Sequence, residues 1–502
     1  MKKELFIAVI ACSLWQVVNA QDSLKMHLQG IRERTDQAQV IRNDFYKSPA
    51  LRPFQYRQSI TPVNISYFAD NRDLYNYQTG SGDKGFSIST DSYQKHIFPN
   101  ITLWGNAKYE NFKVQNLKFN ETSDYELLFP YLTADSVGGN LSTEIYEFSG
   151  GIAKEVGKWI FAGEAGYRAN LSHRKIDPRP INNSSDIKAA LGASYAITSH
   201  YYLSANVDLR FYKQRNELSF VSVLGRPAIY HFNGLGAYNN LISGSAGVQG
   251  DILYQLNAVE AKLILAPKND KGIFIQLGAD QKSGFRTLPL STAHANDWKD
   301  QVVSGKIGYL HNNTDWRYGA IASLDLQTKK GSEGLFNNEG ASTGYVKISE
   351  LSSYRYYNFH YNLEAYIGQK DWSVKPYASY SQIKEQYVNP FREQFTNNVN
   401  FGVQGQYLLE LNRGLFGISL NLQQQKVLDK GSVFNGMVQG TGIADLLQQN
   451  YNYLTAEPFS IGGQARYDFV LSGKIKPFVS VQALSASKIN QKYYTLTLGT
   501  VF

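Results

Sequence analysis

The chain has 502 residues, of which 43% are hydrophobic, 14% aromatic and 18% charged, and its formal net charge is +8. Its mean hydropathy of −0.35 is too low for a bundle of membrane-spanning helices. After residue 20, no apolar run approaches the roughly 18 residues that such a helix needs. The lysines and arginines form no dense cluster, so the sequence gives no reason to expect a nucleic-acid partner.

Tyrosine (35 residues) and glycine (42 residues) are unusually frequent. Transmembrane β-barrels have this composition, because alternate residues of each strand face a wet lumen and aromatic girdles mark both membrane interfaces. A secreted β-sandwich or propeller is the alternative that the composition leaves open.

Residues 1–20 have the features of a secretory signal peptide, since two lysines precede an apolar run that ends in Val-Asn-Ala at 18–20. Cys12, the single cysteine, lies inside that run, so cleavage would leave a mature chain without a thiol. A lipoprotein signal at 9–12 (Val-Ile-Ala-Cys) is the alternative. We favour the secretory signal, because the residues after Cys12 stay apolar.

Residues 22–47 have apolar residues at spacings of three, four and seven, with charged residues between them, which predicts a short amphipathic helix. With a proline-containing linker it forms an N-terminal segment, residues 21–55. This segment could plug a barrel lumen or contact a periplasmic partner. The interpretation that we favour is a helix resting on the mouth of the barrel.

From residue 56 to residue 502 the chain is a series of alternating segments, which predicts a transmembrane β-barrel domain. In residues 159–171 the odd-numbered positions are apolar or small, whereas the even-numbered positions include Glu164 and Arg168. Residues 187–197 and 201–211 repeat the pattern on either side of a short break. Two such strands joined by a tight turn form a hairpin that can cross a bilayer when tilted.

Short breaks and longer connections alternate along this domain, which is typical of barrels with periplasmic turns on one rim and extracellular loops on the other. We therefore expect an all-β fold, a closed antiparallel barrel of about 18 strands. Sixteen strands is the alternative, because Pro62 is poorly suited to the interior of a paired strand. The short breaks are at 198–200, 267–271, 312–315, 368–371, 412–414 and 472–474, and the long connections are near 113–140, 173–185, 213–242, 285–299, 328–350, 386–397 and 428–457.

The last strand has an apolar face that ends in an aromatic residue at the carboxyl terminus, which resembles the closing-strand signal of bacterial outer-membrane barrels. We therefore expect an integral protein of the bacterial outer membrane, whose partners are outer-membrane lipid and the barrel-insertion machinery. The candidate membrane-insertion residues are Tyr494, Leu496, Leu498 and Phe502.

The opposite faces of the strands carry charges of both signs. Such charges could form a porin-like constriction that sets ion preference, or they could neutralise each other as a structural polar core; the sequence leaves both interpretations open. The candidate lumen-lining residues are Glu164, Arg168, Lys188, Asp208, Arg210, Asp280, Lys306, Arg317, Asp325, His360, Glu364, Arg466 and Asp468.

His360 is the only predicted inward histidine with polar neighbours, because Asn358, Asn362 and Glu364 share its strand face. Residues two apart on a strand are separated by roughly 6.5–7 Å, too far for a hydrogen bond between short side chains. The other histidines have no metal-like spacing, and there is no glycine-rich phosphate loop. We therefore predict a protein that is not an enzyme, with no catalytic residue, metal site or cofactor.

The terminal strand, the tyrosine- and glycine-rich hairpins and the signal that ends before Gln21 together resemble an outer-membrane barrel of Bacteroidota type. Over residues 50–502 the chain looks most like a family described only as a β-barrel of unknown function. The resemblance implies a barrel that accompanies TonB-dependent receptors. The chain is not such a receptor itself, because it lacks a plug domain of adequate length.

The function we expect is passage or docking of a solute across the outer membrane. The alternative is an accessory scaffold with a plugged lumen that partners a TonB-dependent receptor, a lipoprotein or a secretion component. An outer-membrane hydrolase is the third possibility.

Overall fold

The computed structural model describes residues 30–33, 37–223, 225–245, 247–269, 271–289, 294–313, 316–337, 345–470 and 475–502. The predicted signal peptide and the start of the predicted helix lie outside these residues.

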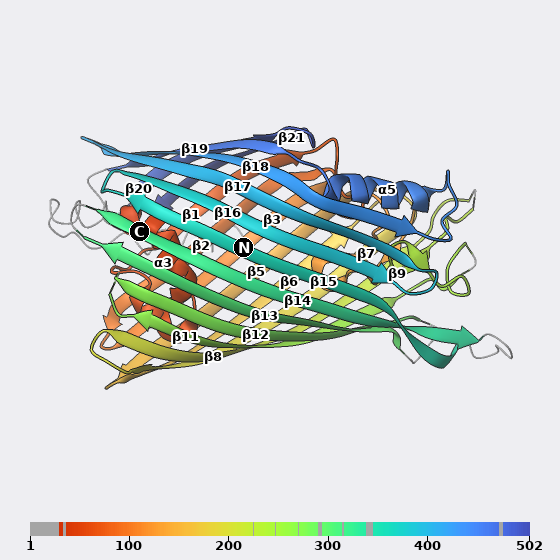
Figure 1. Ribbon diagram of the computed structural model, residues 1–502, viewed down its shortest axis with the longest axis horizontal. Helices are drawn as coiled ribbons and strands as arrows, with labels where there is room; N and C mark the ends of the chain where they lie inside the picture. The colour runs from red at the N-terminus through yellow and green to blue at the C-terminus, as the bar shows by residue number, and fades with distance from the viewer. Residues whose placement is uncertain are drawn as a thin grey trace, which may run out of the picture.

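Eighteen antiparallel strands form one closed barrel (Figure 1). Each strand pairs with its neighbours along the chain, and β1 closes the barrel by pairing with β21, from Pro62 opposite Val501 to Asn71 opposite Lys492. The strands are β1 (Pro62–Asn71), β2 (Gly82–Phe98), β3 (Ile101–Leu117), β5 (Gly139–Val156), β6 (Trp159–His173), β7 (Arg179–Ala196), β8 (Tyr201–Ser219), β11 (Ile252–Pro267), β12 (Gly272–Thr287), β13 (His294–Asn312), β14 (Arg317–Asn337), β15 (Val346–Gly368), β16 (Trp372–Tyr387), β17 (Arg392–Leu411), β18 (Gly414–Phe434), β19 (Phe459–Phe469), β20 (Lys476–Ala486) and β21 (Gln491–Val501).

The predicted closed barrel of 18 strands is confirmed. Pro62 raised the alternative of 16 strands, but it is the first residue of β1. A proline is tolerated at that position because the first residue of a strand does not have to donate to the ladder.

The two ends of the barrel differ. Tight turns such as 99–100 and 157–158 join strands at one end, the short-turn end, where α3 and the carboxyl terminus also lie. Longer connections, including 118–138, 220–251 and 435–458, lie at the other end, the long-loop end.

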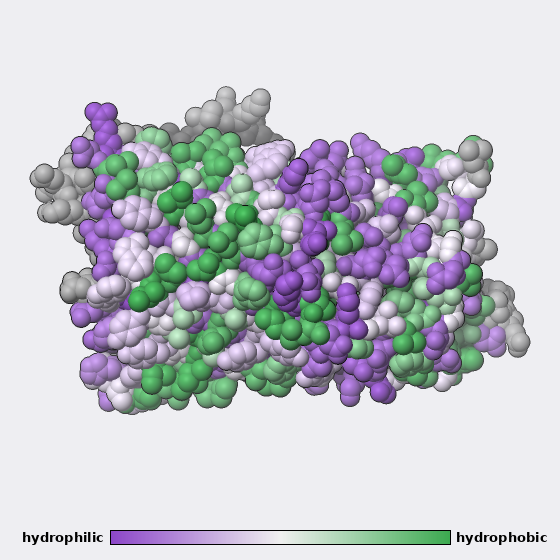
Figure 2. All heavy atoms as spheres, turned by 45° about the horizontal axis from the view of Figure 1, so that its top comes forward, coloured by the Kyte–Doolittle hydropathy of each residue, from purple (hydrophilic) through white to green (hydrophobic). Residues whose placement is uncertain are grey.

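An apolar belt covers the outer face of the barrel toward the short-turn end, and polar residues become frequent toward the long-loop end (Figure 2). Leu191, Leu277 and Leu420 point outward in this belt and are 69%, 57% and 56% exposed. A belt of this kind is stable when it contacts acyl chains, and closure pairs every strand edge. Within the described residues no helix is both long and apolar enough to span a membrane. The four predicted insertion residues also face outward: Tyr494, Leu496, Leu498 and Phe502.

The N-terminal segment, which we define as the described residues from 30 to 61, lies inside the lumen at the short-turn end. It contains α3 (Gln37–Tyr46) and the 3₁₀ helix η1 (Pro49–Phe54). Phe45 and Leu51 are fully buried against side chains of the barrel wall. The preferred prediction, a helix resting on the barrel mouth, is therefore wrong, because these apolar side chains pack against the inner face of the wall.

Three long connections fold inward from the long-loop end. Loop 118–138 contains α4 (Tyr125–Leu128) and β4 (Thr133–Ala134), and β4 pairs with β9 (Tyr230–Gly234) of the next inward-folded connection. That connection also forms β10 (Ala237–Tyr238), and the third contains α5 (Gly442–Leu454). Leu128, Tyr131 and Leu132 of loop 118–138 are completely buried. The lumen thus has an apolar core at this end.

Candidate functional site

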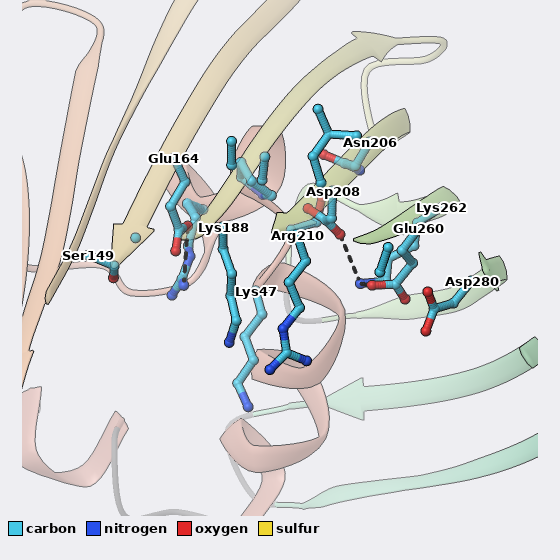
Figure 3. A pocket seen from close by; sticks show the side chains of 18 of the residues that line it. Lys47, Ser149, Glu164, Lys188, Asn206, Asp208, Arg210, Glu260, Lys262 and Asp280 are labelled. Atoms are coloured by element: carbon cyan, nitrogen blue, oxygen red, sulfur yellow. Dashed lines mark hydrogen bonds and ion pairs between the residues drawn. The ribbon is translucent and has the colours of Figure 1, made fainter. Parts of the chain in front are cut away.

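A cavity of about 570 Å³, which we call the chamber, lies in the lumen between the N-terminal segment and the walls of β5–β8, β11 and β12 (Figure 3). Its volume is in the range of small-molecule binding sites. Seven acidic and seven basic residues line it: Asp44, Glu147, Glu164, Asp186, Asp208, Glu260 and Asp280, with Lys47, Arg52, Arg168, Lys188, Arg210, Lys262 and Lys282.

The strand register places four of the six acidic residues of the wall in one cross-strand row. Asp208 on β8 lies directly opposite Glu260 on β11, and Glu260 lies directly opposite Asp280 on β12. Ala190 separates Asp208 from Glu164 in the same cross-strand row. Like charges directly opposite each other are destabilising unless cations offset them.

Lysines offset most of this acidic row. Lys262 Nζ lies 3.2 Å from Asp208 and 2.7 Å from Glu260, and Lys282 Nζ lies 2.8 Å from Asp280. Two lysines thus face three carboxylates on three consecutive strands, so one negative charge of the row stays without a cation of its own.

Glu164 is held at one side of the chamber by the N-terminal segment and by β3. The indole nitrogen of Trp104 donates to Glu164 at 2.8 Å. Arg52 of η1 lies 3.9 Å from the same carboxylate and stacks over the Trp104 ring. Glu164 therefore ties η1 to the wall and has little freedom to bind a ligand.

A row of basic residues lies next to the acidic row, on the side of the long-loop end. Lys188 on β7 is directly opposite Arg210 on β8, and Lys282 follows in the row after Ala258. Asp186 holds Arg210 through two hydrogen bonds of 2.8 and 2.7 Å. The basic residues of this row thus lie beside the acidic row along the wall of the chamber.

Contacts with four sides of the wall hold the N-terminal segment across the lumen. Arg32 pairs with Asp371 beside β16 and with Glu410 of β17, each at 3.1 Å. Phe45 stacks on Phe274 of β12 with ring centroids 4.9 Å apart. At the far side, the β7 residue Ser194 donates to the Ala50 carbonyl, the β2 residue Tyr93 donates to the Arg52 carbonyl, and Lys95, also of β2, donates to the Pro53 carbonyl.

Loop 118–138 is held at the long-loop end by a buried cluster that we call the latch, formed by Arg174, Glu121 and Asp135. Arg174 donates to both carboxylates at 2.8 Å. Burial, followed by the charge of Asp135, raises the pKa of Glu121 well above its usual value. Burial alone would also raise the pKa of Asp135, but the hydrogen bond from Glu121 and the Arg174 charge lower it.

Asp124 connects loop 118–138 to the chamber. The chamber residue Arg168 makes a bidentate pair with its carboxylate, with distances of 3.1 and 2.8 Å. The hydroxyls of Ser184 and Tyr212 also donate to it. The chamber is therefore linked to both of the structures that occupy the lumen.

The sequence of the barrel matches the model of one known protein family. A model of this family matches residues 49–502.

The chain belongs to DUF6850, a family of unknown function.

No curated protein matches this DUF6850 chain. Among solved structures, it is similar to the ferric preacinetobactin receptor BauA from Acinetobacter baumannii, with 8% identity, a TM-score of 0.39, and coverage of 89% of this chain and 80% of the receptor. It is also similar to the ferric-catecholate import receptor Fiu from E. coli K12 in its open form (8% identity, TM-score 0.39, coverage 88% and 81%). It is similar as well to the ferric yersiniabactin uptake receptor FyuA from Yersinia pestis, with 8% identity, a TM-score of 0.37, and coverage of 89% of this chain and 80% of the receptor.

The candidate lumen residues predicted from the sequence divide into two groups in this DUF6850 barrel. Glu164, Arg168, Lys188, Asp208, Arg210 and Asp280 line the chamber. The other seven lie elsewhere on the strands: Lys306, Arg317, Asp325, His360, Glu364, Arg466 and Asp468.

Several residues of the second group are neutralised locally. Lys306 pairs with Asp44 of α3, Glu364 pairs with Lys375 at 2.9 Å, and Arg466 pairs with Asp468 at 2.6 Å. They have the character of the structural polar core that was one of the two interpretations of the sequence.

His360 lies in a row that single-strand reasoning missed. It is directly opposite Asp325 on β14 and Ser381 on β16. Within the described structure no hydrogen bond joins these three residues, so the row lacks the contacts by which a nucleophile and its base act together. Nor does any group of three or more His, Cys, Asp or Glu among the described residues form a site for a metal ion.

The sequence reasoning also missed most of the residues that build the site. The sequence predicts that Lys47 ends a helix on the mouth of the barrel. It predicts that Glu121, Asp124 and Asp135 belong to a long connection outside the barrel. The usable signal was the number of acidic residues in 118–138, since they occur beside Leu128, Tyr131 and other apolar residues. Such a mixture is typical of a connection that folds inward.

Proposed function

We propose that the protein is an integral outer-membrane barrel, not an enzyme, that docks a solute in the chamber without forming an open pore. The observation that carries this proposal is the chamber itself, which lies in a lumen occupied from both ends. Its volume of about 570 Å³ suits a small molecule.

The apolar outer belt and the alternation of turns and loops support a location in the outer membrane. By analogy with other barrels of this layout, the short-turn end faces the periplasm and the long-loop end faces the outside. The same proposal includes four further points: a cleaved signal at 1–20, a barrel domain that begins near residue 56, a Bacteroidota source, and insertion through the last strand.

Single-channel recording of the full-length protein in planar bilayers tests this function. We expect no stable conductance steps, because the N-terminal segment and loop 118–138 occupy the lumen. Moderate urea is the positive control, since lumen segments of low local stability open before the barrel wall unfolds. Steady conductance without urea, of the size expected for an open 18-stranded channel, would overturn the proposal.

Occupation of the lumen from both ends also favours a second candidate, an accessory scaffold for a TonB-dependent receptor, a lipoprotein or a secretion component. Gentle purification from native membranes separates the two functions. A stoichiometric partner, together with the failure of a solute panel to bind, would favour the scaffold. Solute binding by the isolated barrel would favour docking.

A further inference from the structure

Two lysines of the chamber have no ion-pair partner in the described structure. Lys188 projects from β7, and Lys47 projects from the turn between α3 and η1 (Figure 3). Both point into the same part of the chamber as Arg210. Every other basic residue that lines the chamber lies close to a carboxylate: Arg52, Arg168, Arg210, Lys262 and Lys282.

The placement of Lys188 is unfavourable for the barrel alone. It lies directly opposite Arg210 on the adjacent strand, and like charges in this position destabilise a sheet. Asp186 binds the Nε and Nη2 edge of Arg210 and compensates that cation, but it makes no ion pair with Lys188. A third cation, Lys47, is then brought to the same place by the segment that crosses the lumen.

None of the carboxylates of the chamber wall forms an ion pair with Lys47 or Lys188 in the described structure. Asp208 and Glu260 are engaged by Lys262, and Asp280 is engaged by Lys282. The remaining lining acid of the wall, Glu147, lies directly opposite Arg168 and Lys108 on its two neighbouring strands. Lys47 and Lys188 are exposed to the chamber, so their charges are accessible to a solute that enters it.

We propose that Lys47, Lys188 and Arg210 form a binding site for an oxyanion group, either a carboxylate or a phosphate, of a small solute in the chamber. This inference rests on the docking function proposed above. The two ammonium groups supply point charges, and the free edge of the Arg210 guanidinium supplies further N–H donors. Because the acidic row lies beside the site, a solute with a single anionic end fits better than a polyanion.

Isothermal titration of the full-length protein in nonionic detergent tests the site. The titrants are inorganic phosphate and butyrate, with glucose as a neutral control and 1,4-diaminobutane as a cationic control. We expect one of the two oxyanions to bind, and the better of the two identifies the anionic group. Its affinity should fall as salt is added, because added ions screen the attraction.

Lys188→Gln is the first variant. It removes a like-charge opposition, so the barrel should fold at least as well as the wild type, and the heat-dependent gel shift of folded barrels checks this. Lys47→Gln tests the contribution of the N-terminal segment. Lys375→Gln is the matched control, because it removes one lysine that pairs with Glu364 and does not line the chamber.

Binding that is at least tenfold weaker in Lys188→Gln and in Lys47→Gln, but unchanged in Lys375→Gln, would support the site. The site would be overturned if all three variants lose affinity equally, or if all three keep the wild-type affinity. It would also be overturned if the wild type binds neither oxyanion. If glucose or 1,4-diaminobutane alone binds, the oxyanion site fails while docking stands. An open pore in the conductance experiment would remove docking whatever the titration shows.

Discussion

Arg174 and Glu121 form an ion pair of 2.8 Å in which the side chains are only 2% and 0% exposed. Asp135 completes the cluster at the same distance. The second oxygen of Glu121, Oε2, is buried and has no hydrogen-bond partner. The latch therefore fixes loop 118–138 in the lumen.

Substitution Arg174→Gln should loosen loop 118–138. Two buried acids would lose their cation, and the loss of one partner of a buried pair costs about 3–5 kcal/mol. Limited proteolysis after Lys118 measures the effect, which should be a large increase in cleavage. Arg179→Gln is the control, because its pair with Asp177 is partly exposed and is worth at most about 1 kcal/mol. If the two variants are cleaved to a similar extent, then the latch does not hold loop 118–138 in the lumen.

Substitution Leu277→Arg should destabilise the barrel in lipid. Leu277 lies in the apolar belt and is 57% exposed, and an arginine at the bilayer midplane costs about 2–4 kcal/mol. Gln281→Arg is the control on the same strand, because Gln281 already forms a hydrogen bond with Gln301 on the outer face beyond the belt. It should cost about 0–1 kcal/mol. Urea titration in lipid vesicles measures both, and equal costs would exclude a membrane boundary between the two positions.

Substitution Gly192→Ala should weaken the contact between the N-terminal segment and the wall. A Cβ at Gly192 would meet Asn206 and would lie 3.1 Å from the Ala50 Cβ. Overpacking of this kind costs about 1–3 kcal/mol, so brief conductance events should appear in planar bilayers. In Gly405→Ala, where a Cβ would have nothing within 4 Å, the recording should stay silent. Silence of both variants would show that η1 does not obstruct the lumen.

The stability of β9 should fall as the pH falls. Burial, followed by the charge of Arg286, lowers the pKa of His231 from 6.5 to about 3. The folded state then binds fewer protons than the unfolded state between these two values, so its stability is lost as the pH drops through this window. Hydrogen exchange of β9, corrected for intrinsic rates, should show roughly 1–2 kcal/mol less protection at about pH 5 than at about pH 7.

The control for this pH dependence is His231→Gln, which retains a donor for the Val248 carbonyl that His231 contacts at 3.0 Å. Protection of β9 in this variant should be nearly independent of pH over the same range. If the wild type and the variant respond to pH equally, then another group carries the effect.

The barrel could be predicted from the sequence because period-two alternation is local, as in the stripe that contains Leu277. The register of the strand pairs could not be predicted, because it depends on the turns: whether Lys188 lies opposite Arg210 is decided by how the turn between β7 and β8 closes. The inward position of Phe45 could not be predicted either, because nothing local distinguishes an aromatic residue on a surface segment from one that packs against the wall. The candidate site therefore depends on contacts between segments far apart in sequence.

Hydrogen exchange of the full-length protein in lipid nanodiscs tests most directly whether the lumen is occupied from both ends. Residues 42–54 and 118–138 should exchange nearly as slowly as the barrel strands, because their amides lie in a packed lumen. Exchange of both segments within seconds, as in an exposed connection such as 435–440, would contradict the account.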